Sequence, residues 1–400
     1  MILVQKFGGT SIGSIKSLAR VLKFIERAIA AGHKPVVVVS AMSGVTDSLV
    51  NTFYSISRSR PCPEYDSILS TGEQISSAIV ALSLQARGIK ARSFLGWQLP
   101  IVTSSNYSCA KVISVGIEAI EQSILQNEVP VISGFQGISN ENRISTLGRG
   151  GSDTSALAIS AALKANVCNI YTDVSGIFSA DPNKVSNPVR IDKLSYRQAL
   201  LMASSGAKVL HPRAIEIAMN HDIEINVLSS FEDNSPMSII NKNNIIEKDS
   251  VLSINSIKDA VLIKIQDTES YSSKLNALTD IFKNVNTQSL HIYFDVKGNR
   301  SLSILLGKDN YRQIAEQVEE FCEKNTMIFV ICENISSVTL TCSSLSSITL
   351  FASEAIGHLT DSGIEVTDVI SSDLNLSLII NKVDELTAIN KLHDKFINVA

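Results

Sequence analysis

The first half of the chain alternates short β-branched apolar runs with longer segments of helical periodicity, and this alternation restricts the fold more than any other feature. Met1–Lys6 and Val36–Ser40 are typical of buried strands, and between them Ile15–Ala31 repeats apolar residues at helical spacing. The same criteria predict further strands at Ala91–Phe94, Val129–Ser133 and Asn169–Thr172, and helices at Gly72–Gln85, Val112–Leu125, Thr154–Ala162 and Tyr196–Ser204. Such alternation predicts an α/β fold with a mostly parallel sheet.

A polar stretch, Ser229–Asn244, precedes a C-terminal part with a different order of elements, βαββαβ followed by a second copy that lacks its sixth strand. The first copy would use strands Ala260–Gln266, Leu290–Val296, Ser301–Leu306 and Met327–Cys332 and helices Ser273–Phe282 and Tyr311–Glu323. The second would use strands Ser337–Cys342, Val366–Ile370 and Leu376–Ile380 and helices Leu350–Leu359 and Val383–Phe396.

One strand-like segment, Ser250–Ile254, is left over, and we expect it to complete the second copy's sheet, because that edge would otherwise stay open. The two copies would then interlock. The expected boundaries are 1–230 for the first domain, 231–249 for a linker, 250–334 for the first module and 335–400 for the second, with 250–257 completing the second module's sheet.

Composition excludes several classes of protein. The 400 residues carry a net charge of −4, which argues against a nucleic-acid partner. No apolar run approaches the length of a membrane span, and the N-terminus does not resemble a signal peptide. The six cysteines form no C-x-x-C pair and have no zinc-ligand spacing, so we expect free thiols in a reducing compartment, which means a cytoplasmic protein.

Two lysine-containing motifs are candidates for phosphate binding. Lys6–Ser11 (KFGGTS) ends a strand in two glycines, whose amides can approach a phosphate closely, and Lys6 adds a mobile positive charge. Gly206–Pro212 (GAKVLHP) brings a second cation, Lys208. The alternatives are an ordinary Gly-Gly turn and a solvated surface lysine, and His211 fits a structural place before a helix-starting proline.

The most informative stretch is Thr146–Thr154 (TLGRGGSDT), in which three glycines and an arginine precede a helix. Arg149 can hold a carboxylate through two parallel hydrogen bonds, and the glycine amides can surround a transferring phosphoryl group. The alternative is a flexible loop that caps the helix. Neither a Walker A loop nor a G-x-G-x-x-G pattern occurs in the chain, so the corresponding nucleotide-binding folds lose their main support.

Three other motifs suit small-molecule binding. Ser40–Thr46 places hydroxyls at the carboxyl end of a parallel strand, where α/β proteins bind ligands, although it could simply cap the next helix. Glu73 falls in the first turn of the expected helix, where it would either bind an ammonium group or only complement the helix dipole. Tyr171–Pro182 is a strand and turn suited to a nucleoside, or a structural turn.

Together and in this order, these motifs resemble the aspartate kinase family of the amino-acid kinase superfamily. The resemblance runs through KFGGTS, VSAMSGVTD, STGEQISSA, GFQG, TLGRGGSDT, YTDVSGIFSADP and GAKVLHPRA, which cover residues 1–230 nearly continuously. It implies a three-layer amino-acid-kinase domain, followed by two ACT-like modules. It also implies transfer of phosphate from ATP, with Mg²⁺, to the β-carboxylate of L-aspartate, which gives 4-phospho-L-aspartate for lysine (diaminopimelate), threonine and methionine synthesis.

The resemblance also implies roles for individual residues. Lys6, Asp153 and Lys208 would be catalytic, with Asp153 orienting the lysines. Aspartate would be held by Ser40, Thr46, Glu73, Arg149 and Ser152. ATP would be bound by Lys6, Phe7, Gly8, Gly9, Gly150, Gly151, Thr172, Asp173, Phe178, Asp181, Asn183, Lys208 and Val209. Magnesium would be bound through the ATP phosphates rather than by side chains, and an amino-acid effector and a homodimer or higher oligomer would follow from the ACT-like modules.

The sequence departs from the family pattern at three places. Asn183 stands where the family has an arginine, and Phe178 where a tyrosine is common. The loops expected to bind an effector, 267–272 and 343–347, contain no glycine. Two other functions remain as alternatives: a glutamate or N-acetylglutamate kinase, and a non-catalytic amino-acid sensor. Glu73 argues against an acylated amine, because a buried acid would then lack its charged partner.

Overall fold

The computed structural model describes residues 1–57, 61–207, 210–243, 249–266, 281, 291–295 and 301–397, with the backbone alone at 291–295 and 301. The chain divides into two compact units, which are described separately. The first unit comprises Met1–Ile177, Ile191–Tyr196 and Val209–Ile245. The second comprises Phe178–Arg190, Arg197–Lys208 and Ile246–Ala400.

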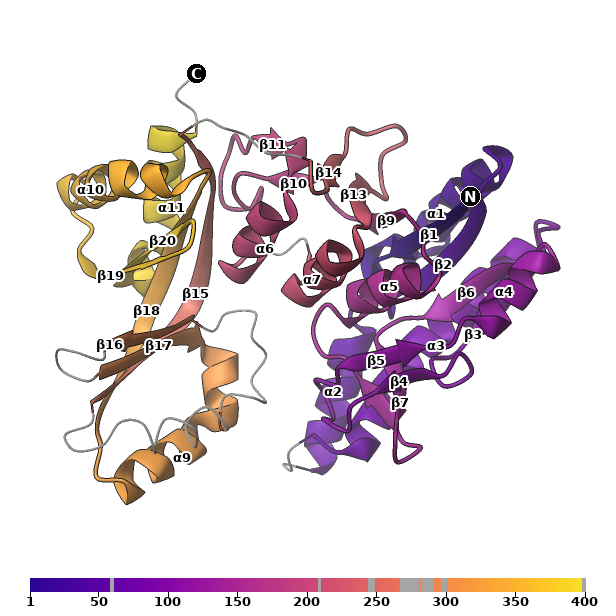
Figure 1. Cartoon of the computed structure of the whole chain (residues 1–400), viewed down its shortest axis with the longest axis horizontal. Helices are drawn as coiled ribbons and strands as arrows, with labels where there is room; N and C mark the ends of the chain where they lie inside the picture. Colours follow the sequence, from indigo (N-terminus) through magenta and orange to yellow (C-terminus); the bar gives the residue numbers. More distant parts are fainter. Residues whose placement is uncertain are drawn as a thin grey trace. The chain divides into compact units, whose positions relative to one another are not determined.

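The first unit is built on an eight-stranded sheet in the order β12-β14-β13-β9-β1-β2-β6-β3. Every neighbouring pair is parallel except β13 with β14, so the sheet is mostly parallel as predicted (Figure 1). The strands are β1 (Ile2–Phe7), β2 (Lys34–Val39), β3 (Ala91–Phe94), β6 (Val129–Ser133), β9 (Val167–Thr172), β12 (Lys193–Leu194), β13 (Glu224–Ser229) and β14 (Ser238–Ile240). The last of these strands arises within the stretch that sequence alone suggested as a linker.

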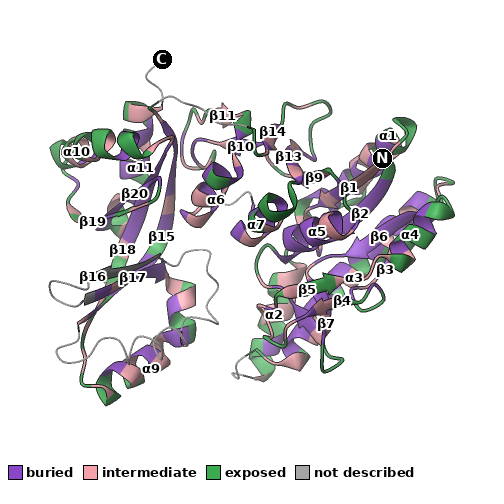
Figure 2. Cartoon of the chain, in the orientation of Figure 1, coloured by how far each residue is buried: buried purple, intermediate pink, exposed green. Residues whose placement is uncertain are grey.

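Helices cover both faces of this sheet, which gives the expected three layers. One face packs against α1 (Ile15–Ala30) and α3 (Pro63–Gln85) through a core that includes Val21, Ile25, Val37, Val80 and Leu84. On the other face, α5 (Gly151–Ala162) packs against β1, β2, β9 and α7 (Pro212–His221). Because both faces are covered, β2 is a continuous apolar run with all of its valines buried, as Figure 2 shows for the sheet in general.

A smaller, four-stranded sheet lies beside the large one in the first unit, in the order β5-β4-β7-β8. Its strands are β4 (Ile101–Thr103), β5 (Val112–Val115), β7 (Gln136–Ser139) and β8 (Ile144–Thr146), and the unit also contains α2 (Val45–Ile56) and α4 (Glu118–Leu125). The helix predicted over Val112–Leu125 is therefore wrong in its first part. Val112 and Val115 are β-branched and pair with β4, so the helix starts only after Gly116.

The second large correction concerns α3, which begins at Pro63 rather than at Gly72. Pro63 occupies the first turn, and Glu64 and Asp66 supply the acidic residues that favour a helix start. Glu73 consequently lies in the middle of a long helix. The interpretation that placed Glu73 in a first turn as a dipole partner is wrong.

The second unit contains a six-stranded antiparallel sheet in the order β16-β17-β15-β18-β20-β19. Two of its strands are much longer than predicted, because β15 (Val251–Gln266) and β18 (Ile328–Cys342) each run continuously through segments expected to be two strands. The front of β15 pairs with the end of β18, Ile254 lying opposite Leu340. The other strands are β16 (His291–Asp295), β17 (Ser301–Gly307), β19 (Val366–Ser372) and β20 (Asn375–Asn381).

Helices of the second unit pack on two separate cores of this sheet. Helix α9 (Lys308–Lys324) packs with β17 and the end of β15, and α10 (Leu345–Asp361) and α11 (Glu385–Phe396) pack with β18 and β20. A 3₁₀ turn, Lys382–Asp384, precedes α11. The helix predicted over Ser273–Phe282 lies outside the described residues except for Ile281.

A short piece from the middle of the sequence also belongs to the second unit. Segment 178–190 contributes Ala180 and Val185 to the core of α10 and α11, and Ser179 Oγ lies 2.8 Å from His393 Nε2. The short strands β10 (Ile177–Phe178) and β11 (Arg190–Ile191) pair with each other, and α6 runs over Tyr196–Ser204 as predicted.

Candidate active site

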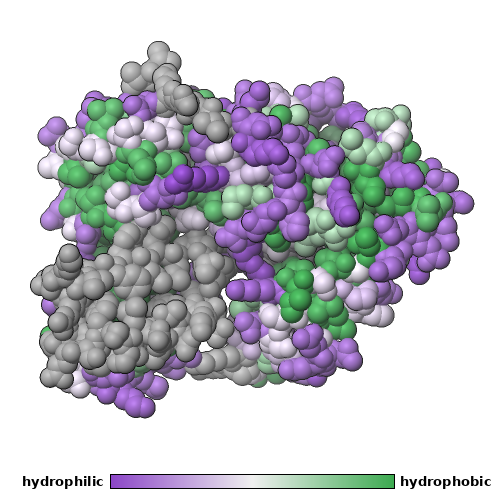
Figure 3. All heavy atoms as spheres, viewed as in Figure 1, coloured by the Kyte–Doolittle hydropathy of each residue, from purple (hydrophilic) through white to green (hydrophobic). Residues whose placement is uncertain are grey.

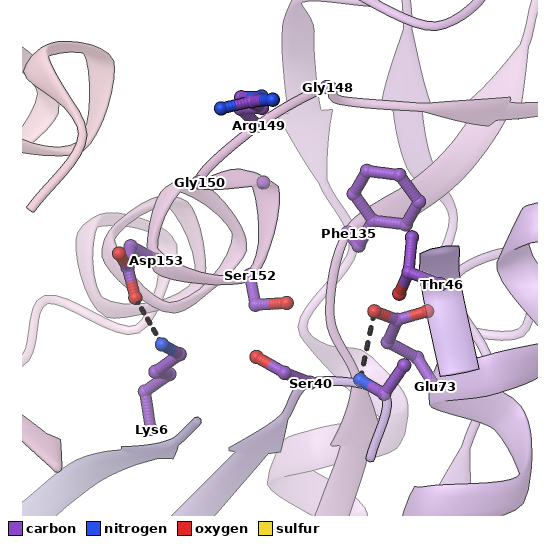
Figure 4. Close-up of a pocket in the computed structure, with 12 residues that line it drawn as sticks. Lys6, Ser40, Thr46, Glu73, Phe135, Gly148, Arg149, Gly150, Ser152 and Asp153 are labelled. Atoms are coloured by element: carbon purple, nitrogen blue, oxygen red, sulfur yellow. Dashed lines mark hydrogen bonds and ion pairs between the residues drawn. The ribbon is translucent and has the colours of Figure 1, made fainter. Parts of the chain in front are cut away.

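A cavity of about 310 Å³ opens in the first unit beside the carboxyl ends of β1 and β2 and the start of α5. This is the edge at which open α/β sheets bind their ligands. Its walls come from five separate parts of the sequence and are drawn in Figure 4. The lining residues are Lys6, Ser40, Ala41, Thr46, Glu73, Phe135, Gly148, Arg149, Gly150, Gly151, Ser152 and Asp153.

One wall holds a nearly buried ion pair. Lys6 Nζ, at the end of β1, lies 2.6 Å from Asp153 Oδ1, in the first turn of α5, and the two side chains are 12% and 9% exposed. An acid in a first turn is favoured by the helix dipole, which helps to hold Asp153 in place. Burial of such a pair seldom adds net stability, so its position at a cavity is better explained by function. The pair fixes an ammonium group at the cavity wall.

The glycine-rich loop turns sharply into α5 and exposes the helix start to the cavity. Gly148 and Gly150 have positive φ angles of 77° and 65°, which other residues adopt at a cost. A Cβ atom on Gly150 would lie 2.3 Å from the His211 Cβ, so a side chain would not fit there. His211 itself caps α7 and accepts a hydrogen bond from the backbone N–H of Arg213, as expected for a structural residue. The first turn of α5 thus presents the positive end of its dipole.

The opposite wall carries a buried carboxylate. Glu73 is 4% exposed, and its Oε1 accepts a hydrogen bond of 2.9 Å from the Ala41 N–H. Its Oε2 has no hydrogen-bond partner among the described residues. Burial raises the pKa of Glu73 to about 7, and the Ala41 N–H partly opposes this. Helix α3 can approach Ala41 this closely because residue 72 is glycine, where a Cβ would lie 2.7 Å from Ala41 Cβ.

Hydroxyl groups lie between these two walls. In Figure 4, Ser40 and Ser152 point into the space between Lys6 and Glu73, and Thr46 lies next to the Glu73 carboxylate. Arg149 stands at the rim, on the loop that carries the glycines. The cavity therefore combines the Lys6 ammonium group of an ion pair, a helix N-terminus, an arginine and the carboxylate of Glu73. Such a set suits a ligand with both negative and positive groups.

The two glycines after β1 allow the loops of this site to approach one another closely. Gly8 donates a 3.2 Å hydrogen bond to the Tyr171 carbonyl, and a Cβ on Gly9 would lie 2.5 Å from the Ala41 carbonyl oxygen. Close approach of these loops therefore requires glycine at residue 9. The Phe7 side chain is fully buried and stacks on Tyr171 with ring centroids 4.6 Å apart, so only its backbone can serve a ligand.

The structure does not gather all of the predicted residues in this cavity. Thr172 ends β9 in the first unit and Asp173 follows it. Thr172 Oγ1 donates a 3.1 Å hydrogen bond to Asp173 Oδ1, but the two residues do not line the cavity. Phe178, Asp181 and Asn183 belong to the second unit. Lys208 and Val209 lie outside the described residues.

Sequence reasoning missed three residues that shape the site. Phe135 lines the cavity with a φ of 68°, a costly conformation for an aromatic residue, and its N–H donates to Ser155 Oγ at 3.0 Å. Asp66 and Arg213 both bind the backbone next to the glycine-rich loop. Asp66 precedes Glu73 by seven residues, which is two helical turns, and would have been noticed had the start of α3 been set at Pro63.

Among the described residues, no helix is long and apolar enough to cross a membrane. The face of the first unit drawn in Figure 3 interleaves hydrophilic and hydrophobic residues.

Comparison with known proteins identifies the class to which this fold and site belong. The model of the amino acid kinase family matches residues 1–229, so the chain belongs to that family. Within it, the chain belongs with the aspartokinases, the kinases that phosphorylate aspartate. It is 36% identical to an aspartokinase of Rickettsia felis, over 99% of both chains, and 34% identical to one of Geobacillus stearothermophilus, over 99% of this chain and 97% of the relative.

Solved structures agree about the fold. The E. coli aspartokinase III in complex with aspartate and ADP superimposes with a TM-score of 0.84 at 22% identity, over 98% of this chain and 99% of that one. The structure of Clostridium acetobutylicum aspartate kinase gives a TM-score of 0.71 at 22% identity, over 98% and 100%. The predicted α/β class and the predicted family are both confirmed.

Proposed function

We propose that this chain transfers the γ-phosphoryl group of ATP to the side-chain carboxylate of L-aspartate at the cavity between Lys6 and Glu73. The observation that carries the proposal is that one cavity has a cationic wall and, opposite it, a wall with a buried carboxylate. One wall holds Lys6 with Asp153 at a helix N-terminus, and the other holds Glu73 with an oxygen that no described residue satisfies. Aspartate and a phosphoryl group together supply the matching charges.

Aspartate would bind through its two ends. Its ammonium group would neutralise Glu73, which is otherwise costly to keep ionised in a buried place. Its α-carboxylate would meet Arg149, whose planar guanidinium can form two parallel hydrogen bonds. Ser40, Thr46 and Ser152 would supply hydroxyl groups around the side chain. The β-carboxylate would then be directed toward Lys6.

The nucleotide would lie on the Lys6 side of the cavity. Lys6, Gly8, Gly9, Gly150 and Gly151 would surround the phosphates with a cation and backbone amides, as the positive end of α5 also favours. From the resemblance alone, Lys208 would be the second cation, and the remaining contacts would come from Phe7, Thr172, Asp173, Phe178, Asp181, Asn183 and Val209.

The chemistry needs little proton transfer. A side-chain carboxylate with a pKa near 3.9 is already ionised at neutral pH and can attack phosphorus directly. The bond between the carboxylate oxygen and the γ-phosphorus forms while the bond from that phosphorus to the ADP oxygen breaks. The protein's part is to hold two anions in line and to stabilise the charge on the transferring group. Lys6 would do the latter, and Asp153 would hold it in position.

Magnesium would enter this site on the phosphates of ATP. Within the described ranges, no three His, Cys, Asp or Glu side chains are grouped closely enough to hold a metal ion. In phosphoryl-transfer enzymes Mg²⁺ is commonly bound through substrate phosphates and one or two carboxylates, so the donor set of the cavity fits such an ion. When bound, the ion would neutralise phosphate charge.

The second unit extends the proposal to regulation and assembly. Its two helix-covered halves share one sheet, the arrangement expected of paired ACT-like modules. We therefore propose an amino-acid effector for this unit, a homodimer or higher homo-oligomer, and a cytoplasmic enzyme at the start of lysine, threonine and methionine synthesis.

The test is ATP turnover by the purified chain with aspartate, glutamate or N-acetylglutamate as the phosphoryl acceptor and Mg²⁺ present. Turnover with aspartate alone would support the proposal. Faster turnover with N-acetylglutamate would contradict the role of Glu73, because an acylated amine carries no charge. The same assay with lysine or threonine added would test for an effector.

A further inference from the structure

A second carboxylate on α3, Asp66, is buried where the cavity does not reach it. Its exposed fraction is 0%, and it accepts hydrogen bonds from three donor groups, one on Ser108 and two on Thr146 at the end of β8. The Ser108 N–H lies 3.0 Å from both carboxylate oxygens, the Thr146 N–H lies 2.6 Å from Oδ2, and Thr146 Oγ1 donates to Oδ1 at 2.8 Å. Thr146 is the residue that begins the glycine-rich loop, three positions before Arg149.

Arg213 at the start of α7 holds the same loop by its carbonyl groups. Its Nη1 donates to the Leu147 carbonyl and its Nη2 to the Ala110 carbonyl, both at 2.7 Å. The Ala110 N–H in turn donates to the Thr146 carbonyl at 2.9 Å. The Asp66 carboxylate therefore accepts hydrogen bonds from backbone N–H groups beside the glycine-rich loop, and the Arg213 guanidinium donates to backbone carbonyl groups there. We name Asp66 and Arg213 together the loop clamp.

The loop clamp ties Arg149 to the helix that carries Glu73. Asp66 and Glu73 are seven residues apart on α3, so they lie on one face, about 10 Å apart along the helix axis. A helix of this length is stiff, and charge-assisted hydrogen bonds to it are stronger than neutral ones. The separation between Glu73 and Arg149 is therefore set by α3 and the loop clamp rather than by a free loop.

We propose that Asp66 and Arg213 are positioning residues that fix this separation, and that they thereby select the length of the amino-acid acceptor. The inference rests on the proposed function, in which Glu73 takes the ammonium group and Arg149 the α-carboxylate. A displacement of about 1 Å in a substrate-positioning group can lower activity a hundredfold. A loosened loop would weaken binding of aspartate and admit the longer glutamate more readily.

The alternative is that Asp66 only stabilises the fold. Loss of acceptors for buried N–H groups would then lower thermal stability without changing which acceptor is preferred. The two interpretations differ in the Michaelis constant for aspartate and in the ratio of kcat/KM for aspartate to that for glutamate.

The experiment compares two pairs of variants. Asp66→Asn removes the charge of the clamp, and Glu64→Gln changes an exposed acid on the same helix that pairs with Arg143 at the surface. Thr146→Val removes only the hydroxyl that donates to Asp66, and Thr146→Ser keeps it. Michaelis constants for aspartate and ATP, kcat, the acceptor ratio and the thermal midpoint are measured for each.

We expect Asp66→Asn to raise the KM for aspartate by about tenfold and to lower the aspartate-to-glutamate ratio, with a smaller effect on kcat. Thr146→Val should move KM in the same direction by about threefold, as for one hydrogen bond, whereas Thr146→Ser and Glu64→Gln stay near the wild type.

A lower thermal midpoint in Asp66→Asn, with KM and the acceptor ratio unchanged, would overturn the inference. The assays use the acceptor that the wild-type chain turns over fastest. A wrong substrate assignment would therefore appear in the wild type, while the variants still decide whether the loop clamp controls the acceptor site.

Discussion

Two of the turns that lead from a strand into a helix, those into α5 and α10, differ in whether they leave room for a ligand. The turn into α5 of the first unit is built from Gly148–Gly150 and opens on a cavity with Lys6 and Arg149 in its walls. The turn into α10 of the second unit is built from serines, and the chain's own Asp249 lies against it. The Oδ1 of Asp249 accepts hydrogen bonds from Ser344, Ser346 and Ser347 at 2.6, 2.8 and 2.9 Å.

The carboxylates of Asp249, at the α10 turn, and of Glu73, across the cavity from the α5 turn, have pKa values shifted in opposite directions. Serine hydroxyls, with Ser344 contributing most, lower the pKa of Asp249, whereas burial raises the pKa of Glu73 to about 7. Asp249 already has several hydrogen-bond donors, whereas Glu73 Oε2, which no described residue satisfies, would be stabilised by a cationic ligand. The comparison teaches that glycine keeps a helix start accessible to ligands, whereas serine and an internal acid satisfy it. The corresponding loop of the first module lies outside the described residues.

The largest effect is expected from the ion pair at the α5 turn. Lys6→Met should lower kcat by about 10²–10³, because in the proposed reaction it removes the cation that stabilises the transferring phosphoryl group. Stopped assays of ATP turnover at saturating aspartate would measure this. Lys34→Met, on the neighbouring strand and exposed, is the matched control. A kcat within about threefold of the wild type would contradict the role of Lys6.

The next effect concerns the arginine at the rim. Arg149→Lys should raise the KM for aspartate by about 10- to 100-fold, because lysine keeps the charge but cannot make two parallel hydrogen bonds. Initial-rate kinetics over a range of aspartate concentrations would show it. Arg143→Lys, at an exposed surface pair with Glu64, should change nothing. An equal rise in both variants would mean that Arg149 acts only through general charge.

The titration of Glu73 should make aspartate binding depend on pH. With a pKa of about 7, the fraction of ionised Glu73 rises about tenfold from pH 6 to pH 8, so the KM for aspartate should fall by a similar factor. Glu73→Gln should bind aspartate weakly at every pH. A Michaelis constant with the same pH profile in both proteins would rule out Glu73 as the ammonium ligand.

Ionisation of Glu73 should also affect the stability of the fold. A rise in pH is expected to strengthen aspartate binding through Glu73 but to lower the free energy of unfolding. Because the pKa is raised from 4.5, the folded chain keeps the proton where the unfolded chain has released it, so this contribution to stability is lost as the pH rises from about 4.5 to 7. Glu73→Gln should therefore be more stable than the wild type at pH 8, by on the order of 2 kcal/mol, and not at pH 5. Thermal midpoints at the two pH values would measure the difference.

The smallest effect is expected at the α10 turn. Asp249→Ala should leave turnover and the KM for aspartate unchanged and lower the thermal midpoint by a few degrees, since three hydroxyls lose their acceptor. Its lowered pKa means that this contribution is present above about pH 4 and lost below it. Asp361→Ala, at the other end of α10, should not destabilise the chain, because an acid is unfavourable there. A large loss of turnover in Asp249→Ala would show that the turn is linked to catalysis.

Much of the cavity could be predicted because its residues lie in short local motifs. Lys6, Ser40, Thr46, Glu73, Arg149, Ser152 and Asp153 all line it. Most of them lie at the end of a strand or at the start of a helix, whereas Glu73 lies in the middle of α3. The carboxyl ends of parallel strands meet at one edge of a sheet, which brings these motifs together. The loop clamp has no such local motif, because Asp66 and Arg213 bind the backbone of residues distant in sequence. Its one sequence signal is the two-turn spacing of Asp66 from Glu73, which depends on a helix start at Pro63.

The errors in the fold have a related cause. The first residues of the helix expected over Val112–Leu125 form a strand instead, because Val112–Val115 pairs with β4. Neighbouring residues in the sequence do not indicate that pairing. The sequence predicts separate strands at Ser250–Ile254 and Ala260–Gln266, yet both segments pair with β18 and form one continuous strand. Segment 178–190 packs in the second unit because Ala180 and Val185 join the α10 and α11 core, which no motif indicated.

The sequence by itself determined the α/β alternation, the family and the chemical groups of the site, because hydrophobic period, glycine position and charge are properties of neighbouring residues. Only the tertiary structure decided which carboxylate would keep an oxygen that no described residue satisfies. Glu73 and Asp249 are both acids that accept hydrogen bonds from a loop, but Glu73 is buried against Ala41 with one oxygen unsatisfied by any described residue, and Asp249 is exposed among three serines. Burial and the number of hydrogen-bond donors depend on contacts across the fold, and they set the two pKa values in opposite directions.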